Sequence, residues 1–230
     1  NGSDGYISWL DDVLNISHTA NSDGFEFDYE FKIFDNPNEL RTLINEKNSI
    51  NNKSRIVAGY CWDWATESRT NENICDININ EFDFHMSWNL NNSTTWAIDK
   101  DSVNQAGCIH TSQGLEFDYI GVIIGKDLIY DGGKVVTDFS ERASTDQSLK
   151  GIKKLYKDNK EEALKIADEI IKNTYRTLMT RGQKGCYVYC CDKGLSEYFK
   201  ERLNLIKKRK SILNSSLLGK KLQRMKMNTL

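Results

Sequence analysis

Several features that would reveal an activity directly are missing from this sequence. No run approaches the roughly 18 consecutive apolar residues of a membrane span, and no signal peptide is visible. The chain starts at Asn1 without a methionine, which favours an excised domain over a native N-terminus. With 39 % hydrophobic and 28 % charged residues, the composition is that of a soluble globular protein, which we expect to be cytoplasmic and not bound to a membrane.

The sequence also lacks the loop that holds the phosphates of ATP. No Gly-x-x-x-x-Gly-Lys-Ser/Thr pattern occurs, and no strand ends in paired acids placed to hold Mg²⁺. Without a cradle for the β- and γ-phosphates, this chain is expected to bind ATP weakly and to hydrolyse none. It would be half of an enzyme, inactive alone.

Paired cysteine clusters at zinc-ligand spacing are absent as well. The six cysteines lie mostly inside apolar, strand-like runs, and only Cys186, Cys190 and Cys191 are close in sequence. Adjacent residues of a strand point to opposite faces, so Cys190 and Cys191 cannot both face one metal ion. We therefore expect buried free thiols and no metal site.

Acidic residues are absent after Glu201, although the net charge of the whole chain is only −2. The bases beyond this point are Arg202, Lys207, Lys208, Arg209, Lys210, Lys220, Lys221, Arg224 and Lys226. A basic tail on an acidic body can bind nucleic acid, but it can equally be a solvated helical end. We divide the chain into a domain at 1–203 and a basic C-terminal tail at 204–230, helical or partly disordered.

A strand, a helix and a second strand are predicted in the first third of the chain. Alternating apolar residues between 29 and 33 indicate a half-buried strand. Asn36 and Pro37 are typical of a helix start, and an apolar strand follows from Arg55 to Cys61. This order predicts a right-handed βαβ unit, with its two strands parallel or one apart in the sheet.

The stretch from Gly107 to Gly125 is the most informative part of the sequence. It predicts a short strand into Ile109, a polar turn over 110–114, and a strand over 119–124 that is buried on both faces of a parallel sheet. Ligands bind open α/β sheets at the carboxyl ends of strands. The polar groups that we expect at such an end are His110, Thr111, Ser112 and Glu116.

The best predicted helix lies further along the chain. Apolar residues from Ala163 to Leu178 recur at helical spacing and form one stripe. The end of this helix brings Arg176 and Arg181 to a turn, which precedes a buried strand from Gly185 to Cys191.

Two blocks of this sequence resemble known motifs. His-Thr-Ser-Gln-Gly-Leu-Glu-Phe-Asp, from His110 to Asp118, resembles motif V of superfamily 1 DNA/RNA helicases, and the block 175–185, with Thr180-Arg181-Gly182, is similar to their motif VI. Together with segments 58–64, 86–90 and 135–138, these motifs resemble the Schlafen-group helicase-like family of bacterial P-loop ATPases over roughly residues 1 to 203. Gln113 departs from the pattern, because many helicases have lysine there.

The resemblance implies the fold and the partners. It implies an α/β protein of the RecA-like P-loop NTPase fold, a mostly parallel central sheet flanked by helices, acting as a second motor domain without a Walker A loop. ATP and Mg²⁺ would bind only together with a missing N-terminal RecA-like domain of the same parent protein, and no cofactor is expected to bind tightly to this chain alone. DNA or RNA would be the other partner of what we expect to be a monomer.

The resemblance also implies roles for individual residues. Arg181 would be an arginine finger at the γ-phosphate, although a surface arginine facing a helix dipole is the other interpretation. Glu116 would bind the ribose, with Gly114 letting the backbone approach the nucleotide; alternatively Glu116 is only a turn acid. Arg176 either helps at the phosphates or forms a salt bridge with Asp168 or Glu169.

Nucleic-acid contacts are implied for His110, Thr111 and Ser112, since hydroxyl and imidazole groups are ordinary partners of the phosphate backbone. Trp62 and Trp64 follow a predicted strand and are candidates for stacking on unpaired bases, although aromatic residues more often pack in a core. A non-catalytic module that binds nucleic acid or a protein is the main rival function. A nuclease using Asp118, Asp127, Asp131 and Asp138 is a weaker one.

Overall fold

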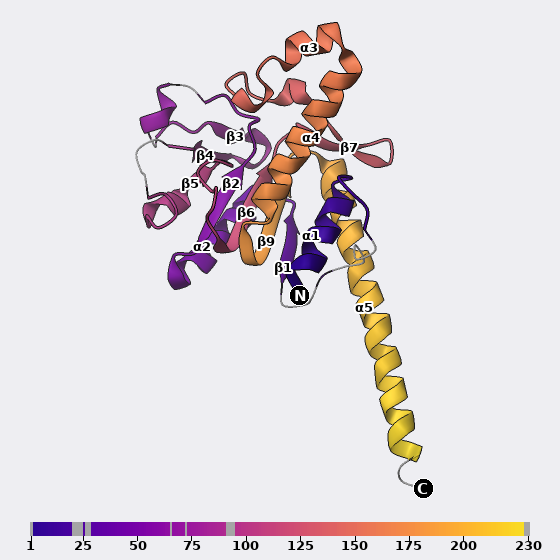
Figure 1. Cartoon of the computed structure of the whole chain (residues 1–230). Coiled ribbons are helices and arrows are strands. Elements are labelled where there is room, and N and C mark those ends of the chain that lie inside the picture. The colour runs from indigo at the N-terminus through magenta and orange to yellow at the C-terminus, as the bar shows by residue number, and fades with distance from the viewer. Residues whose placement is uncertain are drawn as a thin grey trace.

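The computed structural model describes residues 2–19, 25, 29–64, 66–71, 73–90 and 95–227 (Figure 1). Over these residues the helices are α1 (Gly2–Val13), α2 (Pro37–Asn51), α3 (Ile152–Asp158), α4 (Lys160–Met179) and α5 (Lys193–Met227). The strands are β1 (Glu30–Phe34), β2 (Ser54–Ala58), β3 (Ile77–Ile79), β4 (Phe84–Trp88), β5 (Gln105–Gly107), β6 (Phe117–Ile124), β7 (Leu128–Asp131), β8 (Lys134–Thr137) and β9 (Gly182–Cys190).

Within the described residues, seven strands form one sheet in the order β1-β9-β6-β2-β5-β4-β3. Paired strands are parallel, except that β3 runs antiparallel to β4. Strands β7 and β8 form a separate antiparallel hairpin. This mostly parallel sheet, flanked by helices, confirms the predicted α/β architecture and is consistent with a RecA-like fold.

The predicted βαβ unit has the right elements but the wrong spacing. β1, α2 and β2 follow one another in the chain, yet β9 and β6 lie between β1 and β2 in the sheet. β9 pairs with β1 on one side and with β6 on the other. β1 and β2 run parallel, as predicted, but the predicted spacing is wrong because the inserted strands come from much later in the chain. No local pattern shows which distant strand will fill a gap.

Helices cover both faces of the sheet, because successive side chains of a strand point to opposite faces. In β2, Val57 packs in one core with residues of α1, α4 and α5, whereas Ile56 and Ala58 pack in another with residues of α2. Gly121 of β6 lets α2 approach closely, since a Cβ there would lie 2.8 Å from Leu40 Cδ2. In this three-layer structure the amino ends of the parallel strands are left uncovered at one edge of the sheet, and their carboxyl ends at the opposite edge.

The start of α2 is capped as the sequence predicts, and two glycines form a tight turn later in the chain. Asn36 Oδ1 accepts a hydrogen bond from the backbone N–H of Asn38 at 2.9 Å and so caps α2. Gly132 and Gly133, with φ of 56° and 84°, form the two-residue turn of the β7–β8 hairpin. Both need positive φ, which glycine adopts without steric penalty.

Helix α5 runs without interruption through the predicted boundary between residues 203 and 204. Its first part buries Leu195, Phe199 and Ile206 in the core beneath it, and its remainder extends away from the body (Figure 1). The basic tail is therefore helical up to Met227, and residues 228–230 lie outside the described part of the chain. None of the described helices combines the length and the apolar character that crossing a membrane requires.

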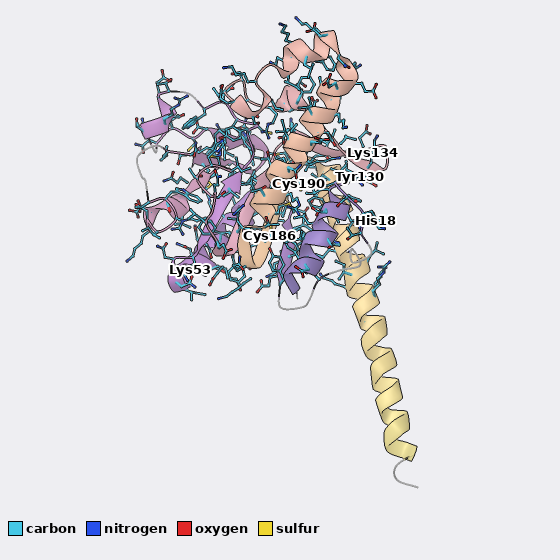
Figure 2. All side chains as sticks on the ribbon, viewed as in Figure 1. His18, Lys53, Tyr130, Lys134, Cys186 and Cys190 are labelled. Atoms are coloured by element: carbon cyan, nitrogen blue, oxygen red, sulfur yellow. The ribbon has the colours of Figure 1, made fainter. Side chains whose placement is uncertain are left out.

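All six cysteines are free thiols. Cys186 and Cys190 lie on β9 within the body of the domain (Figure 2) and are buried, as is Cys108, whereas the other three are partly exposed. Burial raises the pKa of Cys186 to about 12, so this thiol stays protonated at neutral pH. Across the described residues, no three His, Cys, Asp or Glu side chains gather in a way that could hold a metal ion.

Candidate functional site

The two signature blocks meet at the amino-terminal ends of β6 and β9. The backbone N–H of Phe117 donates to the backbone carbonyl of Arg181 at 2.9 Å, and Phe117 pairs in register with Gly182. Glu116 and Arg181 therefore each immediately precede one of two neighbouring parallel strands. The fold brings two residues that are far apart in the chain to one edge of the sheet.

Arg181 lies just after the end of α4 and is partly exposed. Its Nε donates to the backbone carbonyl of Thr177 at 3.2 Å, which is the kind of helix-end contact that the alternative interpretation of this residue expects. A guanidinium has five N–H donors, and the described residues provide no carboxylate partner for the rest. The terminal nitrogens thus remain available to an anion.

Glu116 is exposed and has no hydrogen-bond or ion-pair partner among the described residues. Two residues earlier, Gly114 has a φ of +71° and open space around it, because a Cβ built there would meet no atom within 4 Å. The sugar of a nucleotide can therefore approach this backbone, and a carboxylate accepts hydrogen bonds from two hydroxyls well.

One expectation about this edge is wrong. Glu116 was predicted at the carboxyl end of a strand together with His110, but it directly precedes β6 and lies at the amino end of that strand. Gly107, the last residue of β5, pairs with Val57 near the carboxyl end of β2, whereas Asp118 N donates to Lys53 O beside its amino end. The turn between β5 and β6 therefore crosses from one edge of the sheet to the other.

The polar turn after β5 uses two of its three predicted contact residues internally. Thr111 Oγ1 accepts from Cys108 N at 2.7 Å and donates to Cys108 O at 3.0 Å. Ser112 is fully buried, and its hydroxyl donates to Cys108 O at 3.0 Å. His110 is exposed and lies edge-on to Tyr60, with 6.2 Å between the ring centroids. Of the three, His110 is the side chain that projects from this turn.

Arg176 is held by an aspartate that the sequence did not suggest. Its Nε and Nη2 donate to the two carboxylate oxygens of Asp11 on α1, the second at 3.1 Å. Asp168, one of the two predicted partners, instead pairs with Lys172 at 2.9 Å and accepts from Thr137 Oγ1. Arg176 thus forms a salt bridge, but the bridge joins α4 to α1 and does not run along the helix.

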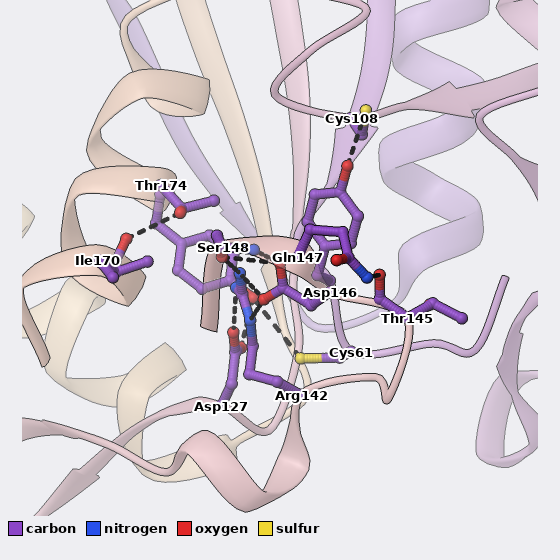
Figure 3. Close-up of polar contacts among 12 residues, drawn as sticks. Cys61, Cys108, Asp127, Arg142, Thr145, Asp146, Gln147, Ser148, Ile170 and Thr174 are labelled. Carbon is purple, nitrogen blue, oxygen red and sulfur yellow. Dashed lines mark hydrogen bonds and ion pairs between the residues drawn. The ribbon is translucent and has the colours of Figure 1, made fainter. Parts of the chain in front are cut away.

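A buried ionic cluster lies at the carboxyl ends of β2 and β6 (Figure 3). Arg142 Nη1 lies 2.9 Å from Asp127 Oδ2, and Arg142 Nε donates to Asp146 Oδ2 at 2.8 Å. The hydroxyl of Tyr175 on α4 donates to Asp127 Oδ1 at 2.5 Å and accepts from the backbone N–H of Gly125 at 3.0 Å. The cluster fastens the segment after β8 to the end of β6 and to α4.

Burial and charge fix the protonation states of Arg142 and Tyr175 in this cluster. Burial by itself lowers the pKa of Arg142, but the carboxylates of Asp127 and Asp146 outweigh burial and leave that pKa raised. Burial, with the charge of Asp127, raises the pKa of Tyr175 well above its ordinary value. The arginine therefore stays charged and the phenol neutral at neutral pH, and the cluster acts as a structural clamp.

Sequence reasoning missed this clamp. Arg142 and Asp146 are four residues apart outside any regular pattern, and Tyr175 reads as one more apolar position of α4. The available signal was local: Asp146 Oδ1 accepts from the backbone N–H of Ser148 at 2.9 Å, an ordinary turn cap. No local pattern indicated Asp127 as the partner.

Of the acids considered for a nuclease, Asp127 and Asp138 adjoin through a backbone hydrogen bond of 2.9 Å, but among the described residues no three acids gather to hold a metal ion. Asp118 pairs with Lys184 at 2.8 Å, Asp127 lies in the clamp, and Asp138 caps a turn by accepting from Ser140 N at 2.9 Å. Asp131 ends β7 beside the hairpin turn. These positions do not converge on one site.

The four tryptophans between residues 62 and 96 differ in burial and surroundings. Trp88 is fully buried, Trp96 is 4 % exposed, and Trp64 lies under the guanidinium of Arg69, 4.2 Å from the ring centroid. Trp62 is half-buried, as Trp64 is, and lines a cavity of about 390 Å³. Of the two tryptophans considered for base stacking, Trp62 is the one that lines this cavity.

Comparison with known proteins identifies a protein family that matches most of this chain. Residues 1–192 match the family described as Schlafen group 3, DNA/RNA helicase domain. The chain is also similar to an uncharacterized protein of Saccharomyces cerevisiae, YPL245W, with 26 % identity over 196 residues, which covers 84 % of this chain and 41 % of the yeast protein. The chain thus spans less than half the length of that relative.

Proposed function

Because this chain belongs to the Schlafen group 3 DNA/RNA helicase domain family, we propose that it is the second RecA-like domain of an ATP-driven motor acting on nucleic acid. In this proposal a partner RecA-like domain holds ATP and Mg²⁺, and this chain supplies Arg181 and Glu116 to the bound nucleotide. The superfamily 1 mechanism, hydrolase activity and ATP binding are all parts of the proposal.

One observation carries most of its weight. The hydrogen bond from Phe117 N to Arg181 O at 2.9 Å places a cation with free donors and an acid without a partner on neighbouring strand ends. A nucleotide offers complementary groups at both of its ends, hydroxyls on the ribose and anionic oxygens on the phosphates. Two such groups on one rigid edge suit a single bound nucleotide.

The chemistry of phosphoryl transfer suits Arg181. Negative charge spreads over the equatorial oxygens of the transferred phosphoryl group, and an arginine supplied from a second domain is worth about 10³ to 10⁵ in rate. The guanidinium bonds two oxygens at once because its donors form a planar fork. Helix α4 fixes the backbone before this residue, and the pairing of β9 with β6 fixes the backbone after it.

Glu116 would accept hydrogen bonds from the ribose hydroxyls. Gly114 would leave space for the sugar to approach the backbone. Arg176 would act indirectly in this proposal, because its pair with Asp11 holds α4 against α1. The phosphate loop and the Mg²⁺ ligands would come from the partner domain, so this chain alone should bind ATP weakly.

Nucleic acid would run along the opposite edge of the sheet, where His110 projects. Thr111 and Ser112 would shape the turn that presents it. Closure of the cleft on ATP would move this edge relative to the partner domain along a strand of DNA or RNA, which is the coupling that a motor needs.

The test uses the full-length protein that contains both RecA-like domains. Replacing Arg181 by Ala should lower nucleic-acid-stimulated hydrolysis by about 10³-fold or more, and Arg181→Lys should recover little, since lysine lacks the planar fork. Unchanged hydrolysis in Arg181→Ala would refute the finger role.

Lys184→Ala is the matched control. Lys184 lies three residues further along the chain, on β9, is exposed, and pairs with Asp118 at 2.8 Å, so its loss should leave the rate within about twofold because such pairs contribute little. If the two-domain protein binds nucleic acid but hydrolyses no ATP at all, the rival function, a non-catalytic binding module on the same fold, is correct.

A further inference from the structure

The cavity beside Trp62 lies at the carboxyl ends of three strands. Trp62 follows β2, Lys126 follows β6, and Tyr189 lies near the end of β9. Asn80, just after β3, and Glu141, after β8, close its other sides. Crevices outside the carboxyl ends of strands are where open α/β sheets bind ligands, and about 390 Å³ lies within the range of small-molecule sites.

One wall of this cavity is aromatic and fixed. Tyr189 is 5 % exposed and packs edge-on against Phe82, with 6.0 Å between ring centroids. Trp62 packs against the same core but keeps part of its ring exposed. An indole held in this way offers a flat surface to another planar ring, and such stacking on a nucleobase is worth about 1 to 3 kcal/mol.

The polar groups of the cavity are available to a ligand. Within the described residues, the side chains of Asn80, Lys126 and Glu141 have no hydrogen-bond or ion-pair partner, whereas Glu81 is paired with Lys193 at 2.8 Å. The cavity thus offers one ammonium, one carboxylate and one amide beside an indole ring. Few ligands carry groups complementary to all four of these side chains.

We propose that this cavity binds a single unpaired nucleobase that carries an exocyclic amine, stacked on Trp62. Glu141 accepts from the amine, as carboxylates do from the N4 amino group of cytosine. Lys126 bonds the adjacent phosphate, and Asn80 can donate and accept at the ring edge. A strand without an amine-bearing base leaves Glu141 unpaired beside its own phosphates, and binds more weakly.

The position of the cavity links it to the predicted nucleic-acid edge. Tyr60, two residues before Trp62, has its ring centroid 6.2 Å from that of His110. In this proposal, a nucleic-acid strand that passes His110 continues to Trp62 along the carboxyl edge of the same sheet. This inference rests on the proposed function, since it specifies how that edge holds a strand.

The experiment measures the binding of the chain to fluorescent oligodeoxycytidine and oligothymidine of equal length, about 12 nucleotides, by anisotropy at one fixed salt concentration. Wild type should prefer oligodeoxycytidine. Trp62→Ala should weaken this binding about tenfold, and Trp62→Phe should retain most of it because phenylalanine still stacks. Glu141→Gln should reduce the preference for cytosine.

Ile50→Ala is the control, because Ile50 is a 76 % exposed apolar residue on α2 and its loss should change nothing. Thermal unfolding of each variant shows that it is folded. On an oligonucleotide made of abasic sites, Trp62→Ala should bind as tightly as wild type, because there is no base to stack. If Trp62→Ala weakened binding to this probe as much as binding to oligodeoxycytidine, Trp62 would not stack on a base, and the inference would be overturned.

Equal binding of wild type and Trp62→Ala to oligodeoxycytidine would also overturn it, while leaving the proposed function intact. The hydrolysis assay with Arg181→Ala tests the proposed function separately, since Arg181 lies at the other edge of the sheet. A normal Arg181 result with a negative Trp62 result thus rejects the cavity alone.

Discussion

Arg142 and Asp127 form an ion pair in which both side chains are almost completely enclosed, 2 % and 0 % exposed, with Nη1 2.9 Å from Oδ2. Removing one partner of such a pair leaves the other charge buried and uncompensated, which costs about 3 to 5 kcal/mol. Arg142→Met should therefore lower the free energy of unfolding by this amount, as measured by urea denaturation.

The exposed pair of Lys184 and Asp118 provides the comparison, because Lys184→Met should cost less than about 1 kcal/mol. Similar losses in the two variants would show that water reaches the clamp. They would contradict its description as a buried ionic cluster.

Asp118 should contribute to the pH dependence of stability. Hydrogen bonds from Lys184 and then from Asn51 lower the pKa of Asp118 relative to its unfolded value of about 3.9. Its contribution is thus present above the unfolded pKa and is lost as the pH falls through the folded pKa. Asp118→Asn should be less stable than wild type near neutral pH, and the two curves should converge in acid. A constant difference down to the lowest pH at which the protein folds would contradict this prediction.

His110 and Ser112 should behave in opposite ways when replaced. Ser112→Ala removes a buried hydroxyl that donates to Cys108 O, so it should cost about 1 kcal/mol of stability and leave nucleic-acid affinity unchanged. His110→Ala removes an exposed ring and should weaken binding with little effect on the melting temperature. The reverse pattern would show that Ser112 reaches the nucleic acid.

Arg176 and Asp11 should act as one unit in stability measurements. Arg176→Gln and Asp11→Asn should each cost about 1 to 2 kcal/mol, and the double variant should cost about as much as either single one. In the two-domain protein, Arg176→Gln should reduce hydrolysis far less than Arg181→Ala. An equal reduction would assign Arg176 to the phosphates and not to the joint between α1 and α4.

The parts of the fold that follow from local chemistry were predictable. Asn36 caps α2, two glycines turn the β7–β8 hairpin, and the apolar stripe from Ala163 to Leu178 forms α4, because each depends on residues a few positions apart. The order of the strands was not predictable, because the insertion of β9 between β1 and β6 is decided by packing across the whole chain.

The candidate site, like the fold, was predictable only in part. The motifs drew attention to two turns, and Glu116 and His110 are exposed there, as turn residues often are. They did not indicate that Ser112 points inward, that Arg176 reaches Asp11, or that Asp127 meets Arg142. Each of these outcomes depends on a partner that is distant in sequence, and the polar residue alone gives no information about it.

The bond between Phe117 and Arg181 belongs to the ladder of two central strands. A loop that carries a catalytic group can swing while the rest of a protein stays still, but a residue anchored at a strand end travels only with the sheet. If Arg181 and Glu116 bind a nucleotide as proposed, they would therefore reach it together, because both are attached to the same two strands. In the proposed motor, the approach of the partner domain would then set the timing of the reaction.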